Sequence, residues 1–141
     1  MADPLFAGTW CKLKIVVVNG PMGTPNGYVG IPQGHPLCGV KYNIPDSNVL
    51  GGRSPEDYFY VHGGLTFSAD YCPDYKDKKF AWWYGFDTNH SMDRDRPKGV
   101  PFVKRHCRRL AKRLSRWSPA PVPKKREPKA RPGFYKEIIN G

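Results

Sequence analysis

Residues 101–117 read PFVKRHCRRLAKRLSRW, and this stretch decides the fold class. At about 100° per residue, the apolar side chains fall on one narrow stripe and the Lys and Arg side chains on the opposite side. The apolar stripe consists of Val103, Cys107, Leu110, Leu114 and Trp117. Pro101 suits the first turn of a helix. The segment therefore predicts an amphipathic helix over 101–117 that packs its stripe on a domain and turns its cations outward.

This predicted helix carries seven Lys and Arg residues and no acid. Exposed helices usually mix both signs, because opposite charges four residues apart stabilise a helix and like charges destabilise it. A bound polyanion would offset the repulsion, so we expect nucleic acid or a nucleoprotein assembly as partner, and an anionic membrane as the weaker alternative. The expected contact residues are Lys104, Arg105, Arg108, Arg109, Lys112, Arg113, Arg116, Lys124, Lys125, Arg126, Lys129 and Arg131.

The charge of the chain is unevenly distributed. The 141 residues carry +11 in total, yet residues 1–97 hold nine basic and ten acidic residues, and residues 98–141 hold fourteen basic and two acidic. Residues 118–132 contain five prolines and five Lys or Arg, a composition typical of extended chain that buries no core. We therefore divide the chain into a compact domain, 1–117, and an extended basic proline-rich tail, 118–141.

The rest of the domain predicts a small sheet. Residues 13–18, LKIVVV, form a β-branched run closed by Asn-Gly, and further strands are expected at 28–31, 58–67 and 80–86. Residues 55–58 favour one helical turn with Ser54 as its cap. The expected fold is α+β: a small antiparallel sheet with long loops, one packed C-terminal amphipathic helix and the tail.

Several classes are disfavoured by what the sequence lacks. It has no run of 18 apolar residues for a transmembrane helix, and no charged-then-apolar N-terminal pattern typical of secretion. The four cysteines form no C-x-x-C pair, so a zinc finger is not expected and free thiols are. No helix-turn-helix, RNA-binding aromatic signature or C₂H₂ spacing is present, so nucleic-acid contacts should be mainly to phosphates.

Two segments gather residue types that carry chemistry. Residues 61–67 read VHGGLTF, and residues 85–93 read GFDTNHSMD. His with a nearby carboxylate serves as general base, metal ligand or simply the anchor of a turn. The candidate catalytic residues are His62, Asp87, His90 and Asp93, and the candidate ligand-pocket residues are His35, His62, Gly63, Gly64, Asp87 and His90. No convincing nucleophile accompanies them, the sequence leaves any cofactor unknown, and the spacing of Asp87, His90 and Asp93 alone does not establish a metal site.

The aromatic run at 80–86 alternates between the two faces of its expected strand. We interpret it as core. An exposed member would instead offer a surface on which a nucleobase stacks.

Three motifs occur in a fixed order: GYVGIPQGHPLCG at 27–39, VHGGLTFS at 61–68 and WWYGFDTNHSMD at 82–93. Together they resemble a family of small proteins encoded by bacteriophages and prophages, over about residues 27–116. The resemblance implies a viral origin and a helix after the third motif, but no biochemical activity. Family members usually end soon after that helix, so the tail departs from the pattern.

The functional expectation is a phage-type, non-enzymatic protein whose basic helix and tail contact nucleic acid or a nucleoprotein assembly in the host cytoplasm. One alternative is a small-ligand (nucleotide) binding protein or hydrolase with a His/Asp site, acting against host defence. Another is a structural component of the virion. A host protein partner and the oligomeric state are left open by the sequence.

Overall fold

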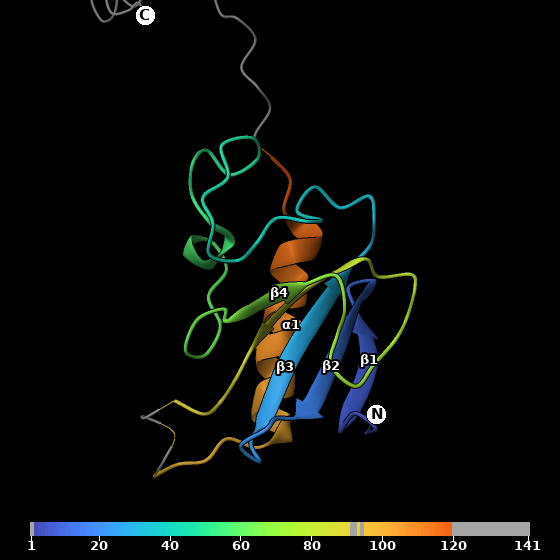
Figure 1. The fold of residues 1–141 in the computed structure, drawn as a ribbon, viewed down its shortest axis with the longest axis vertical. Coiled ribbons are helices and arrows are strands. Elements are labelled where there is room, and N and C mark those ends of the chain that lie inside the picture. The colour runs from blue at the N-terminus through green and yellow to red at the C-terminus, as the bar shows by residue number, and fades with distance from the viewer. Residues whose placement is uncertain (1, 91–92, 94, 120–141) are drawn as a thin grey trace, which may run out of the picture.

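The computed structural model describes residues 2–90, 93 and 95–119, and it confirms the α+β class with a small antiparallel sheet and one C-terminal helix (Figure 1). All strand pairs are antiparallel, in the order β1-β2-β3-β5-β4. The elements are β1 (Phe6–Trp10), β2 (Leu13–Asn19), β3 (Pro25–Ile31), the 3-10 turn η1 (Pro55–Asp57), β4 (Phe67–Ala69), β5 (Trp82–Phe86) and α1 (Val100–Arg116). The predicted tail, 118–141, lies outside the described residues from position 120 onward.

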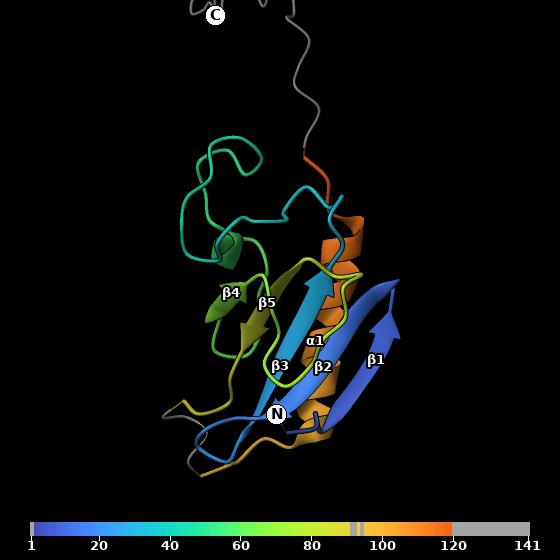
Figure 2. The ribbon, with the colours of Figure 1, turned by 45° about the vertical axis from the view of Figure 1, so that its right-hand side comes forward.

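Helix α1 covers one face of the sheet and crosses β2 and β3 (Figure 2). Its predicted apolar stripe is buried there: Val103, Cys107, Leu110 and Leu114 are fully inaccessible, and Trp117 is half-buried. The partners from the sheet are Leu13, Ile15, Val17, Val29, Ile31, Tyr84 and Phe86. Sequestering this apolar area is the main force that holds the helix on the sheet.

The opposite face of the sheet has a smaller core of its own. The loop over residues 70–81 passes in front of the sheet in Figure 1 and places Cys72, Tyr75 and Phe80 against Val16 and Trp83. Because both faces are covered, β2 is apolar at successive positions instead of alternating. The aromatic run of β5 is therefore core on both sides, and Trp83 does not offer a stacking surface.

Two glycines of β3 explain the GYVG motif in structural terms. A Cβ on Gly30 would lie 2.8 Å from the Trp83 ring, and a Cβ on Gly27 would lie 2.7 Å from Cys107 Sγ. Such distances are too short for any side chain, so these positions let an aromatic ring and helix α1 approach the strand closely. The motif is thus accounted for by packing.

Two parts of the sheet differ from the sequence expectation. The strand expected over 58–67 is wrong: residues 58–66 form a loop, and only Phe67–Ala69 pairs with β5. Its alternation arose because Phe59, Val61 and Leu65 reach the core from this loop. Strand β1 was not predicted, since its hairpin turns on Cys11 and Lys12, two residues with positive φ that lack the usual Asn-Gly signal.

The cysteines and the helix length agree with the sequence interpretation. All four cysteines are free thiols; Cys72 and Cys107 are buried, and burial raises the pKa of each to about 12. Among the described residues, no helix is long and apolar enough to cross a membrane.

Candidate functional site

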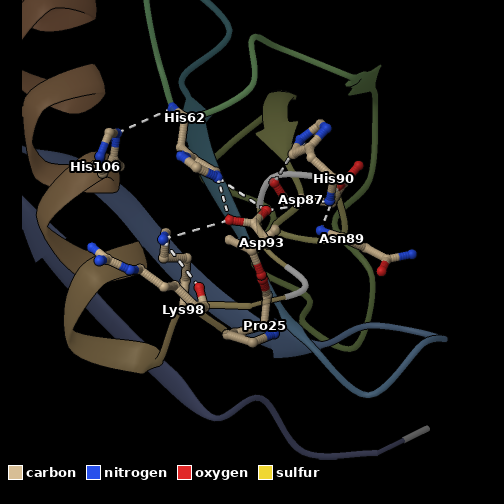
Figure 3. Close-up of polar contacts among 10 residues, drawn as sticks. Pro25, His62, Asp87, Asn89, His90, Asp93, Lys98 and His106 are labelled. Atoms are coloured by element: carbon tan, nitrogen blue, oxygen red, sulfur yellow. Dashed lines mark hydrogen bonds and ion pairs between the residues drawn. The ribbon is translucent and has the colours of Figure 1, made fainter.

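The centre of the candidate site is a buried pair, His62 and Asp93 (Figure 3). His62 lies in the loop before β4, and Asp93 follows β5 in the chain. The imidazole Nε2 of His62 is 2.8 Å from Oδ1 and 3.0 Å from Oδ2 of Asp93, so it donates to the carboxylate. Only 4 % of the Asp93 side chain is exposed. A carboxylate buried to this degree requires such partners.

Two further groups support the Asp93 carboxylate. The backbone N–H of His90 donates to Oδ2 at 3.2 Å, and Nζ of Lys98 lies 3.7 Å from Oδ1. Burial alone would raise the pKa of Asp93, but the hydrogen bonds from His62 and from the His90 amide outweigh burial, and the net pKa is lowered. Asp93 is therefore ionised at neutral pH and is an acceptor, not a proton donor.

A second His/Asp pair lies beside the first. His90 Nε2 is 3.2 Å from Oδ1 of Asp87 and 3.1 Å from its carbonyl oxygen, and the rings of His90 and His62 meet edge-on with centroids 5.7 Å apart. The hydroxyl of Thr66 donates to Oδ2 of Asp87 at 3.4 Å. The structure thus brings together all four candidate catalytic residues.

Gly63 and Gly64 of the VHGGLTF segment form the turn between His62 and Thr66. Gly63 has φ 73° and Gly64 has φ 86°, both in the left-handed region that favours glycine. A Cβ on Gly63 would collide with the imidazole of His90, whereas a Cβ on Gly64 would meet nothing within 4 Å. Gly63 is therefore required twice, by its backbone and by the ring packed against it.

Helix α1 closes the network from the other side. The backbone N–H of His62 donates to Nδ1 of His106 at 3.2 Å, and the Phe102 ring meets the His62 ring edge-on at 5.1 Å. Because Nδ1 of His106 accepts, its proton sits on Nε2. Burial, followed by the charge of Arg109, lowers the pKa of His106, which favours this neutral form.

We call the two pairs, His62–Asp93 and His90–Asp87, the clasp, because their side chains hold one another in place. Each carboxylate is held by donors, and the described residues contain no group of three or more His, Cys, Asp or Glu arranged to hold a metal ion.

Asp87 also borders an open hollow of about 450 Å³ with Asn26, Tyr28 and Thr66 in its wall. Burial raises the pKa of the Tyr28 hydroxyl to about 12, so it remains a neutral donor there.

His35 does not belong to this network. Its Nδ1 accepts from the Leu37 amide at 3.0 Å, and its Nε2 donates to the Leu114 carbonyl at 2.7 Å. The Leu114 carbonyl also accepts from the amide of Trp117, the residue that caps the helix, so His35 is its second donor. The GHPL motif therefore fixes a loop to the C-terminal end of α1.

The cations of α1 divide into two groups. Lys104 lies over the Phe6 ring at 4.0 Å, and the Arg108 guanidinium lies over the Trp10 ring at 5.0 Å. Both cations therefore make cation–π contacts with β1. The remaining five are exposed, namely Arg105, Arg109, Lys112, Arg113 and Arg116. Among residues 2–90, 93 and 95–119, none of the seven forms an ion pair with an acid.

Four of the exposed cations line a groove that sequence reasoning did not foresee. Its volume is about 250 Å³, and its walls are Tyr60, His106, Arg109, Lys112, Arg113 and Arg116. Tyr60 comes from the loop that also carries His62, and His106 precedes Arg109 by one helical turn. The signal in the sequence was that spacing, because residues three and four apart share a helix face.

The other predicted nucleic-acid contacts, Lys124, Lys125, Arg126, Lys129 and Arg131, lie outside the described residues. Comparison of the chain with family models, curated proteins and solved structures found no match.

Proposed function

We propose that this protein binds nucleic acid through the solvent face of α1, with the phosphates as its main contacts. The observation that carries the proposal is the row of five exposed cations, which has no acidic partner among the described residues. The compact part before residue 98 is nearly charge-balanced, so the positive charge is concentrated on this surface and the sequence after it. A phosphate backbone is the common biological polyanion that such a surface fits.

The energetics of the helix favour an anionic partner. Among Arg109, Lys112, Arg113 and Arg116, four pairs are three or four residues apart, and like charges at these spacings cost a few tenths of a kcal/mol per pair. Burial of the apolar stripe offsets this cost in the free protein. A phosphate chain would replace the repulsion by attraction, and the counterions released from it would add to the binding free energy.

Binding should depend steeply on salt and weakly on base sequence. The logarithm of the binding constant falls with the logarithm of salt concentration by about 0.7 to 0.9 for each phosphate neutralised. Five cations therefore predict a slope of about −3.5 or steeper for the full-length chain. Fluorescence anisotropy of a labelled oligonucleotide across a salt series measures this slope, and a flat plot would refute the proposal.

A second candidate function rests on the convergence of the two His/Asp pairs beside the hollow at Asp87. It is the binding of a small ligand such as a nucleotide, with Asp87 and Thr66 as polar contacts. Calorimetric titration of nucleotides into the wild type and into Asp87→Asn tests it. A heat of binding that Asp87→Asn abolishes supports the function, and no heat in the wild type rejects it. The viral origin and the action in a host cytoplasm stay proposals from the motif resemblance.

A further inference from the structure

The groove on α1 differs from an ordinary charged surface in its composition. It is lined by four cations, an aromatic ring and an imidazole. His106, Arg109, Arg113 and Arg116 follow one another at spacings of three, four and three residues, so they form a stripe along one flank of the helix. At 1.5 Å per residue, this stripe is about 15 Å long.

Tyr60 is exposed to solvent and lines the groove beside this stripe. The residue is 66 % exposed, although its two chain neighbours, Phe59 and Val61, are buried in the core. These neighbours fix the backbone, and the loop is tied to α1 through the amide of His62. The ring of Tyr60 lies 6.4 Å from that of His106 at an angle of 60°. A single exposed tyrosine is common on protein surfaces, but this one has a fixed backbone and lines a cationic groove.

The size of the groove argues for a chain and against an enclosed small molecule. Sites that enclose drug-sized ligands have volumes of about 300–1,000 Å³, whereas this groove has about 250 Å³ and is open to solvent. Its cations are suited to phosphates, and Nε2–H of His106 is a further donor because Nδ1 is occupied. The Tyr60 ring is an apolar surface of the kind on which bases stack.

From this arrangement we infer that the groove binds single-stranded nucleic acid, with phosphates along Arg109, Arg113 and Arg116 and one base stacked on Tyr60. This inference rests on the proposed function and adds to it a preference for unpaired strands. In a duplex the bases are stacked on one another and are not free to meet a protruding ring, whereas single strands offer their bases to aromatic side chains.

The test compares two oligomers that carry the same phosphates. One is a short oligothymidine, and the other is an abasic strand of equal length. We expect the wild type to bind the oligothymidine more tightly, by about fivefold or more for one stacked base. Tyr60→Ala should remove this preference and leave the affinity for the abasic strand unchanged, while Tyr60→Phe should keep it.

Tyr58→Ala is the matched control, because Tyr58 is an exposed tyrosine of the same loop that does not line the groove. It should retain the wild-type preference. Equal affinity of the wild type for both oligomers, or equal weakening of both by Tyr60→Ala, overturns the stacking inference and leaves the proposed function standing. Absence of binding to either oligomer at low salt overturns both.

Discussion

The backbone amide of His62 donates a 3.2 Å hydrogen bond to Nδ1 of His106, and this contact joins the buried histidine–aspartate network to the cationic helix. The imidazole of His62 is at the same time held by Asp93. Tyr60 lies two residues before His62, so the network positions one wall of the groove relative to the other. The motif residues and the basic helix are thus parts of one arrangement.

Replacement of Asp93 tests the network directly. Asp93→Asn removes the charge that His62, the His90 amide and Lys98 share, and we expect it to lower the free energy of unfolding by about 1–3 kcal/mol at pH 7. Urea denaturation measures the loss. Asp70→Asn is the control, because Asp70 is an exposed acid outside the network. Equal stability of the two variants would show that the clasp contributes nothing.

The same comparison has a defined pH dependence. The pKa of Asp93 is lower in the folded protein than in the unfolded chain, so its contribution is present above the unfolded value of about 3.9 and is lost as pH falls through the folded value. The difference in stability between wild type and Asp93→Asn should therefore shrink in acid. A difference that stays constant from pH 7 to well below the unfolded value would contradict the assigned role of the charge.

The two glycines after His62 separate backbone strain from a steric clash. Both have positive φ, but only a Cβ on Gly63 would meet a neighbour, the His90 ring. We expect Gly63→Ala to cost about 1–3 kcal/mol and Gly64→Ala less, the excess being the clash. The double variant Gly63→Ala/His90→Ala should not show this excess relative to His90→Ala. Thermal unfolding followed by circular dichroism measures all four, and an equal cost for both glycines would exclude the clash.

The pKa of His106 depends on the charges around the groove. Burial and then the charge of Arg109 lower its pKa, so stability that depends on the neutral ring is complete above the unfolded value of about 6.5 and is lost as pH falls through the folded value. Arg109→Ala should raise the pKa of His106, and a bound oligonucleotide should also raise it. NMR titration of the ring protons measures both shifts. Lys76→Ala, a change to an exposed cation outside the groove, should leave the pKa as in the wild type.

The elements with a strong apolar period could be predicted from sequence. Helix α1 and strand β2 carry long apolar patterns, and these patterns placed each within one residue of its observed bounds. Strand β1 lacked such a signal, because all five of its residues are half-buried or exposed. The loop over residues 58–66 imitated a strand, because buried Phe59, Val61 and Leu65 are spaced as alternate strand positions would be.

The candidate site was predictable in part for the same reason. His62, Asp87, His90 and Asp93 belong to segments next to neighbouring strands, so their proximity followed once β4 and β5 paired. His35 does not join these residues, because it is hydrogen-bonded to Leu114, which lies 79 residues away in sequence. No local sequence pattern predicts such a contact. Tyr60 and His106 were not predicted as site residues, because the groove exists only after the loop docks on α1.

The most direct measurement is the salt dependence of oligonucleotide binding by two matched triple variants. Lys112→Ala/Arg113→Ala/Arg116→Ala removes three exposed cations of the groove, and Lys76→Ala/Lys78→Ala/Lys79→Ala removes three exposed cations from the loop on the opposite face of the sheet. We expect the first variant to reduce the slope of the log–log plot by about 2 and the second to keep the wild-type slope. Equal slopes for both variants would contradict nucleic-acid binding by α1.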